Sequence, residues 1–173
     1  MTEPAAWPEA DRHWLLEAIG LSRQCPQSPT AYSVGAVLVA ADGRVLSTGY
    51  SRESGPEDHA EEAALAKLGL PGAAAAAAAA GGAAAVAGGA QELATATLYS
   101  SLEPCAVRAS RPVPCADLII ASGIGRVVIA WIEPPVLAPG GGASRLHAAG
   151  VEVIEMPELA AAAREVNAHL LAC

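Results

Sequence analysis

The chain has 173 residues, of which 53% are hydrophobic, and this is enough for one domain with a sizeable core. Only 3% are aromatic and none is Phe, so the core must be built from Leu, Ile and Val. The net charge of -8 and the single lysine, Lys67, argue against a protein that binds nucleic acid, because phosphate binding needs clustered basic side chains.

The N-terminus has neither a basic segment nor a compact apolar stretch, so we expect no secretion signal and a cytoplasmic protein. We also expect no membrane association, because only a tract of Ala and Gly approaches the roughly 18 residues of a membrane span, and that tract is weakly apolar. Four cysteines in an intracellular chain favour metal binding or structural thiols over disulfides.

The first part of the chain predicts a helix, a hairpin and a second helix. Residues 9–24 have the apolar spacing of an amphipathic helix. Residues 34–40 and 44–50 predict two strands, and Asp42-Gly43 between them is typical of a tight hairpin turn. A further helix is expected from residue 59 to about residue 68.

A low-complexity insertion at about residues 72–91 separates this part from the rest of the chain. Residues 73–90 hold thirteen Ala, four Gly and one Val, which predicts a partly helical or disordered surface segment without a functional motif. Strands are then expected at residues 95–100, 126–131 and 151–154, and helices at 115–122, 143–149 and 159–171. The order predicts a single α/β domain over residues 1–173, a three-layer α-β-α fold with a mixed five-stranded sheet.

Three separate motifs supply one imidazole and two thiols: His59, Cys105 and Cys115. This is the ligand set of a catalytic Zn2+ that keeps its fourth position for water. Each residue falls at a predicted strand end or helix start, and such positions converge at one edge of an α/β sheet. The pattern H-x-E followed by P-C and a second cysteine is typical of zinc deaminases that act on bases.

Glu61 lies two residues after the histidine and is the predicted catalytic proton carrier. Zinc lowers the pKa of water to about 7, and Glu61 would take that proton, protonate a ring nitrogen and help ammonia leave. The adjacent Glu62 must face another direction, as a solvated carboxylate or as one that supports the site.

The two cysteines are separated by nine residues, whereas the deaminase signature has two. The resulting loop carries Arg108 and Arg111, and the loop before the predicted metal helix carries Arg52. Arginine binds phosphate in a bidentate manner, so these three residues indicate a small phosphorylated substrate. The alternative, solvated surface arginines, stays open.

Several stretches resemble the fungal-type pyrimidine deaminases of riboflavin biosynthesis, within the cytidine-deaminase-like superfamily. They are TAYSVGAVLV at 30–39, LSTGYSRE at 46–53, HAEE at 59–62, LEPC at 102–105 with its nine-residue gap, IEP at 132–134 and SR at 144–145. The bacterial riboflavin deaminase domain is similar but usually has a shorter gap. Bacterial members carry an Asn where this chain has Ala31.

The resemblance implies deamination of 2,5-diamino-6-ribitylamino-4(3H)-pyrimidinone 5'-phosphate or its ribosyl form to the 2,4-dione and ammonia. It implies the same zinc ligands and the same role for Glu61. We place Ala60 and Ser101, which adjoin the motifs, with the three arginines among the substrate-binding residues. No second, reductase domain fits this length, and a homodimer is expected.

Other readings remain open at this point. The same chemistry could serve a nucleoside, dCMP, a guanine-like base or a heterocycle of specialised metabolism. An RNA-editing deaminase conflicts with the acidic charge. A non-catalytic zinc module would need a fourth protein ligand, and no candidate lies near the motifs.

Overall fold

The computed structural model describes residues 8–70, 89–135, 137 and 139–171. The described elements are α1 (Glu9–Ser22), β1 (Gly35–Val39), β2 (Val45–Tyr50), α2 (Ala60–Ala66), α3 (Gly89–Thr95), β3 (Thr97–Ser100), α4 (Cys115–Ser122), β4 (Arg126–Ile129), α5 (Gly142–Ala148), β5 (Glu152–Glu155), the 3-10 turn η2 (Pro157–Leu159), α6 (Ala160–Val166) and α7 (Ala168–Leu171). The predicted insertion lies outside the described residues except for its last three, which begin α3.

The sheet has five strands in the order β2-β1-β3-β4-β5. β1 is antiparallel to both neighbours, whereas β3, β4 and β5 are parallel. The first pairing is a hairpin in which Gly43 takes a φ of 85°, as a tight turn with Gly requires, and Asp42 Oδ1 accepts the N–H of Arg44 at 3.0 Å. The predicted mixed five-stranded sheet is confirmed.

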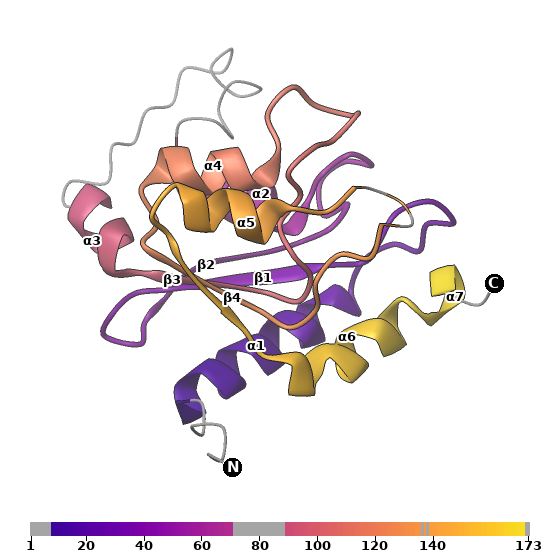
Figure 1. Ribbon diagram of the computed structural model, residues 1–173, viewed down its shortest axis with the longest axis horizontal. Coiled ribbons are helices and arrows are strands. Elements are labelled where there is room, and N and C mark those ends of the chain that lie inside the picture. Colours follow the sequence, from indigo (N-terminus) through magenta and orange to yellow (C-terminus); the bar gives the residue numbers. More distant parts are fainter. Residues whose placement is uncertain (1–7, 71–88, 136, 138, 172–173) are drawn as a thin grey trace.

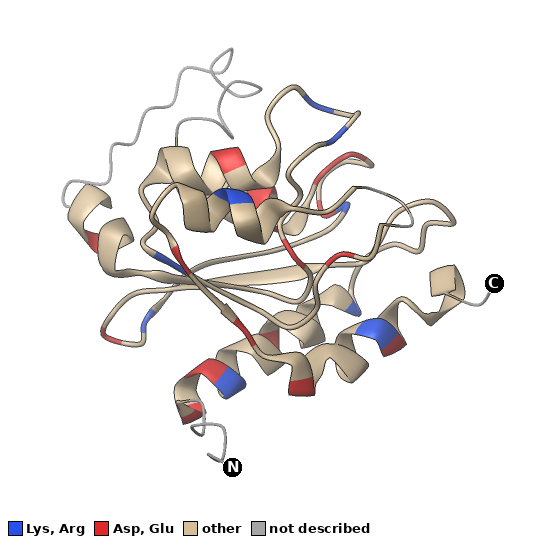
Figure 2. Ribbon diagram, in the orientation of Figure 1, with Lys and Arg blue, Asp and Glu red and all other residues tan. Residues whose placement is uncertain are grey.

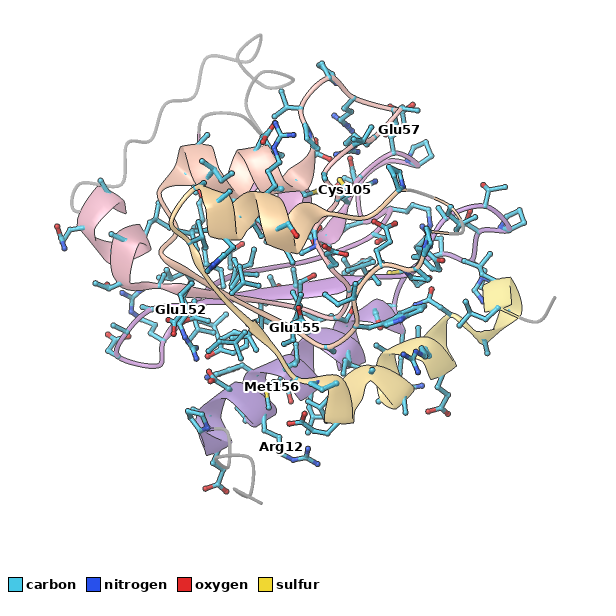
Figure 3. All side chains as sticks on the ribbon, viewed as in Figure 1. Arg12, Glu57, Cys105, Glu152, Glu155 and Met156 are labelled. Atoms are coloured by element: carbon cyan, nitrogen blue, oxygen red, sulfur yellow. The ribbon has the colours of Figure 1, made fainter. Side chains whose placement is uncertain are left out.

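Helices cover both faces of the sheet, and Figure 1 shows α2, α4 and α5 on one face and α1 and α6 on the other. This explains why all five residues of β1 are buried, whereas β2, at the sheet edge, alternates in burial. The core is aliphatic: Leu38, Leu98 and Ile129 are completely buried. Met156 is also completely buried, just after β5, on the side of α1 (Figure 3).

Several boundaries differ by one or two residues from the sequence predictions, and two differences have a clear local cause. The strand expected from residue 95 begins at Thr97, because Thr95 still belongs to α3, a helix that the alanine-rich composition before it concealed. The last helix is interrupted at Asn167, whose backbone leaves helical geometry. The Asn167 side chain accepts the N–H of Ser33 at 2.7 Å and donates to its carbonyl at 3.0 Å, so the break anchors the segment before β1.

Within the described residues no helix is long and apolar enough to cross a membrane. In Figure 2 the Lys and Arg residues are scattered over several elements and do not gather on one of them.

Candidate metal centre and substrate cavity

The three predicted metal ligands meet at one end of the sheet. His59 caps the N-terminus of α2, Cys105 follows β3, and Cys115 is the first residue of α4. The Nδ1 atom of His59 lies 3.5 Å from the Sγ atoms of both cysteines. All three ligand atoms lie within 4.8 Å of one another.

This donor set fits zinc. One imidazole nitrogen and two thiol sulfurs are the soft ligands that a catalytic zinc site uses. Contact with Cys115 lowers the pKa of the Cys105 thiol, which favours the thiolate that binds metal. The backbone N–H of Cys115 also points at Cys105 Sγ, at 3.3 Å. Among the described residues, no fourth His, Cys, Asp or Glu joins the cluster, as an open catalytic site requires.

Glu61 lies beside the cluster in the first turn of α2 and is only 3% exposed. Its Oε1 accepts a hydrogen bond of 2.7 Å from the hydroxyl of Ser100, at the end of β3. Burial raises the pKa of Glu61, and the neighbouring His59 and the Ser100 bond oppose this effect. A buried carboxyl with a raised pKa is suited to accept and return a proton near neutral pH.

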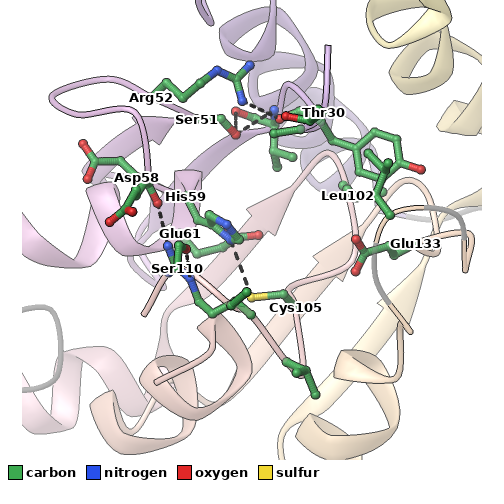
Figure 4. Close-up of a pocket in the computed structure, with 18 of the residues that line it drawn as sticks. Thr30, Ser51, Arg52, Asp58, His59, Glu61, Leu102, Cys105, Ser110 and Glu133 are labelled. Carbon is green, nitrogen blue, oxygen red and sulfur yellow. Dashed lines mark hydrogen bonds between the residues drawn. The ribbon is translucent and has the colours of Figure 1, made fainter. Parts of the chain in front are cut away.

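A cavity of about 600 Å³ opens in front of the centre. Figure 4 shows His59, Glu61 and Cys105 on one side of it, Thr30 and Arg52 on another, and Glu133 on the loop after β4. Its wall also includes apolar side chains, namely Val34, Leu102, Val107, Leu137 and Pro139. A mostly apolar wall with a few fixed polar groups is typical of a site for a small molecule.

The three arginines contact protein groups. Arg52 donates to the carbonyls of Pro26 and Tyr32 at 2.8 and 3.0 Å and to the Ser33 hydroxyl at 3.0 Å. Its φ is 62°, in the left-handed region that non-Gly residues rarely adopt. This backbone conformation costs free energy, which the surrounding contacts must offset.

Arg108 and Arg111 both reach α2. Arg108 donates to Glu62 Oε2 at 3.0 Å and to the carbonyl of Glu57, while Arg111 donates to Asp58 Oδ1 at 2.9 Å and lies 3.3 Å from Glu62 Oε1. Glu62 is 7% exposed, so of its two expected roles the solvated one is wrong. It supports the site by joining the cysteine loop to the helix of His59.

Of the predicted substrate-binding residues, only Arg52 and Arg108 lie on the cavity wall. Arg111 lies beside Asp58 and Glu62, outside the wall. Ala60 is completely buried, and Ser101 accepts the N–H of Gly35 at 3.1 Å. Their contact with substrate stays a prediction.

Three further residues of the site, Glu133, Glu103 and Tyr32, were not predicted from the sequence. Glu133 lines the cavity, and burial, with the charges of Cys105 and Glu103 adding to it, raises its pKa to about 7. Glu103 is buried and accepts the N–H groups of Glu133 and Ala143 at 3.0 and 2.8 Å, which holds the loop between β4 and α5. One signal pointed to Glu133: it is a carboxylate that follows a buried parallel strand at the edge where ligands bind.

An α-β-α sandwich with a His-Cys-Cys centre, a buried glutamate and a small-molecule cavity defines the class of zinc deaminase folds. The chain belongs to the family described as "Cytidine and deoxycytidylate deaminase zinc-binding region", whose model matches residues 8–131. The predicted superfamily and zinc cofactor are therefore confirmed.

Individual proteins within this family are similar to most of the chain. The chain is 34% identical to the diaminohydroxyphosphoribosylamino-pyrimidine deaminase of Schizosaccharomyces pombe, over 86% of this chain and 32% of that protein. It is also 34% identical to the riboflavin biosynthesis protein RibD of Aquifex aeolicus, over 92% of this chain and 38% of that protein. The chain thus spans about a third of the length of these relatives.

Two solved structures have the same fold. Acinetobacter baumannii RibD superposes with a TM-score of 0.72 at 29% identity, covering 95% of this chain and 40% of that one. A C-terminal deletion mutant of the Rib2 deaminase of Aspergillus oryzae superposes with a TM-score of 0.65 at 25% identity, covering 94% of this chain and 99% of that one.

Proposed function

We propose that this chain is a zinc-dependent hydrolytic deaminase of a small phosphorylated amino-pyrimidine. The observation that carries the proposal is the approach of His59 Nδ1 to both cysteine sulfurs, at 3.5 Å each, beside the buried Glu61. The names of the relatives, pyrimidine deaminases of riboflavin biosynthesis, support 2,5-diamino-6-ribitylamino-4(3H)-pyrimidinone 5'-phosphate or its ribosyl form as the substrate.

His59, Cys105 and Cys115 would hold the zinc, which supplies Lewis acidity and makes water a stronger nucleophile at neutral pH. Glu61 would carry out the proton transfers of the reaction. Its carboxylate takes a proton from the attacking water and gives it to the ring nitrogen, and a second proton transfer lets the amine depart as ammonia. The hydrogen bond from Ser100 fixes the carboxylate while its proton is exchanged.

Phosphate binding by the arginines of the cavity is part of the proposal. Arg52 and Arg108 lie on the cavity wall, and each donates three of its five N–H groups to protein acceptors, which leaves two for a ligand. Their fixed guanidinium groups would then meet the phosphate with little loss of side-chain entropy.

The test is a panel of substrates scored for ammonia release with the zinc-loaded protein. It contains the ribitylamino and ribosylamino pyrimidine phosphates, the ribitylamino compound without phosphate, cytidine, dCMP and guanine. We expect the two phosphorylated pyrimidines to have the highest kcat/KM. Preference for cytidine, dCMP or guanine would replace the proposed substrate, and no release from any member, with zinc bound, would favour a non-catalytic module.

We also propose a cytoplasmic homodimer that binds neither nucleic acid nor membrane. Sedimentation equilibrium at several concentrations tests the dimer, and a mass of one chain throughout would exclude it.

A further inference from the structure

Two oxygen atoms in side chains on the cavity wall have no hydrogen-bond partner among the described residues: the Tyr32 hydroxyl and Glu133 Oε2. Both side chains are more than nine-tenths buried, since Tyr32 is 7% exposed and Glu133 is 9% exposed. Buried polar groups in proteins are nearly always hydrogen-bonded, because an unpaired one costs folding free energy. Two such groups on one cavity therefore point to a ligand.

The Tyr32 side chain is fixed in its place. Its ring meets the ring of Trp131 edge to face, with centroids 5.5 Å apart and planes at 72°. Trp131 in turn lies under the guanidinium of Arg164, 5.6 Å from its ring centroid. The backbone carbonyl of Tyr32 accepts a hydrogen bond from Arg52. The Tyr32 side chain is thus held in place in the cavity wall, and its hydroxyl has no partner among the described residues.

Glu133 is held from its backbone. Its N–H donates to Glu103 Oε2 at 3.0 Å, and Glu103 Oε1 accepts the N–H of Ala143, so one buried carboxylate fixes both ends of the loop. Figure 4 shows the Glu133 carboxyl pointing from this loop toward the side of the cavity that holds Cys105. The charge of Glu133 also contributes to a raised pKa of Tyr32, after burial, as expected for two groups that lie near each other.

The charges on the wall separate two kinds of ligand group. Arg108 and Arg52 suit an anion, whereas Glu133 in its ionised carboxylate form repels one. A hydrogen-bond donor on a neutral heterocycle is the complement of Glu133, and a hydroxyl such as that of Tyr32 can donate or accept.

We propose that Tyr32 and Glu133 together bind a hydrogen-bond donor on the substrate heterocycle, an exocyclic amine or a ring N–H, and thereby select aminated rings. The inference deepens the proposed function and rests on it for the identity of the ring. It assigns specificity to two residues that do not ligate the metal.

The test compares Tyr32→Phe and Glu133→Gln with the unsubstituted protein, all zinc-loaded. Tyr32→Phe removes only the hydroxyl and keeps the ring against Trp131. Tyr99→Phe is the matched control, because the Tyr99 hydroxyl donates to Asp11 at 2.8 Å away from the cavity. We measure KM and kcat for the phosphorylated diaminopyrimidine and the Tm of the ligand-free proteins.

We expect each cavity variant to raise KM about tenfold, as for one lost hydrogen bond of ~1.4 kcal/mol, and to change kcat less than threefold. The Tm of Tyr32→Phe should equal or exceed that of the unsubstituted protein, because the hydroxyl has no partner to lose. Tyr99→Phe should lower Tm and leave KM unchanged.

An unchanged KM in both cavity variants overturns the inference. So does a Tm of Tyr32→Phe that falls as far as that of Tyr99→Phe, since the hydroxyl would then have a partner in the free protein. Failure of the proposed function looks different: the unsubstituted protein itself would not deaminate this substrate. In that case the roles of Tyr32 and Glu133 are tested by the Tm of their variants and by the KM for any amino-heterocycle of the panel that the protein deaminates.

Discussion

Arg108 Nη1 donates to Glu62 Oε2 at 3.0 Å, and the two side chains are only 2% and 9% exposed. The pair joins the loop between the two cysteines to the helix that begins beside His59. The two-residue spacing of the signature would place both thiols on one turn of a helix. With nine residues between the cysteines, the ion pair instead holds the intervening loop against the helix.

The first prediction concerns this pair. Arg108→Ala should destabilise the protein by about 1–3 kcal/mol, because the buried Glu62 then keeps only Arg111 as a charged partner, and should lower zinc affinity. Chemical denaturation and a competitive zinc chelator measure the two effects. Arg23→Ala is the control: Arg23 pairs with Glu165 at 3.7 Å on the surface, and its loss should cost less than about 1 kcal/mol. Equal costs for the two variants would contradict the structural role.

Glu61→Gln should reduce kcat by about 10²–10⁴-fold, the usual contribution of a general acid–base residue, with zinc still bound. The amide keeps the size of the side chain and can still accept the Ser100 hydrogen bond, but it cannot carry the proton. Ammonia release and zinc content are measured on the same sample. Glu165→Gln, an exposed residue of α6, should retain full activity. Full activity of Glu61→Gln would exclude the proton-transfer role.

The cysteines provide a matched comparison for the metal. Cys105→Ser and Cys115→Ser each remove a thiol of the cluster and should abolish stoichiometric zinc binding. Cys25→Ser makes the same chemical change at a thiol that contacts the carbonyl of Val34, and should keep its zinc. Elemental analysis after dialysis gives the answer. Retained zinc in both cluster variants would show that the ion binds elsewhere.

The metal centre could be predicted from the sequence because its residues lie at strand ends and helix starts. Such positions are visible as local patterns, and α/β topology brings them to one edge. His59, Cys105 and Cys115 therefore needed no knowledge of distant contacts. The five strands followed from short apolar runs in the same way.

The partners of the charged residues could not be predicted. Arg108 and Glu62 are 46 positions apart, and the sequence gives their charges but not which of them meet. The position of Glu133 after a strand is visible in the sequence, but its burial is not, because that depends on the loop that Glu103 holds. These contacts arise from the packing of segments that are far apart in the chain.

Gly49 in β2 lets α2 approach the sheet. A Cβ at this position would collide with the carbonyl oxygen of Ala60, in the first turn of α2 next to His59. Gly49→Ala should therefore destabilise the protein by roughly 1–3 kcal/mol and lower zinc affinity, since α2 must move. Gly20→Ala is the control: apart from the adjacent backbone of α1, no atom of the described residues lies within 4 Å of a Cβ placed there, and this position should gain about 0.5–1 kcal/mol. Denaturation curves that shift alike for both would contradict this packing.

The last prediction concerns pH and the buried group of Asp11, Tyr99 and Arg126. Arg126 donates to Asp11 Oδ2 at 2.7 Å, and this bond lowers the pKa of Asp11. Because the folded state binds fewer protons at Asp11 than the unfolded state, stability is lost as the pH falls through that lowered pKa.

On the alkaline side the dependence of stability on pH has the opposite sign. Burial and the hydrogen bond to Asp11 raise the pKa of Tyr99 from its usual 10.0 to about 12. The folded state then holds a proton that the unfolded state releases, so stability is present below pH 10 and declines as the pH rises through about 12, by up to ~3 kcal/mol at ~1.4 kcal/mol per pKa unit. Tyr99→Phe should be less stable than the unsubstituted protein at about pH 8. It should also lose less stability than that protein between about pH 9.5 and about pH 12. Denaturation in urea at each pH measures this, with Tyr50→Phe in β2 as the control that retains the full decline. An alkaline decline that is equal in Tyr99→Phe and Tyr50→Phe would show that other groups cause it.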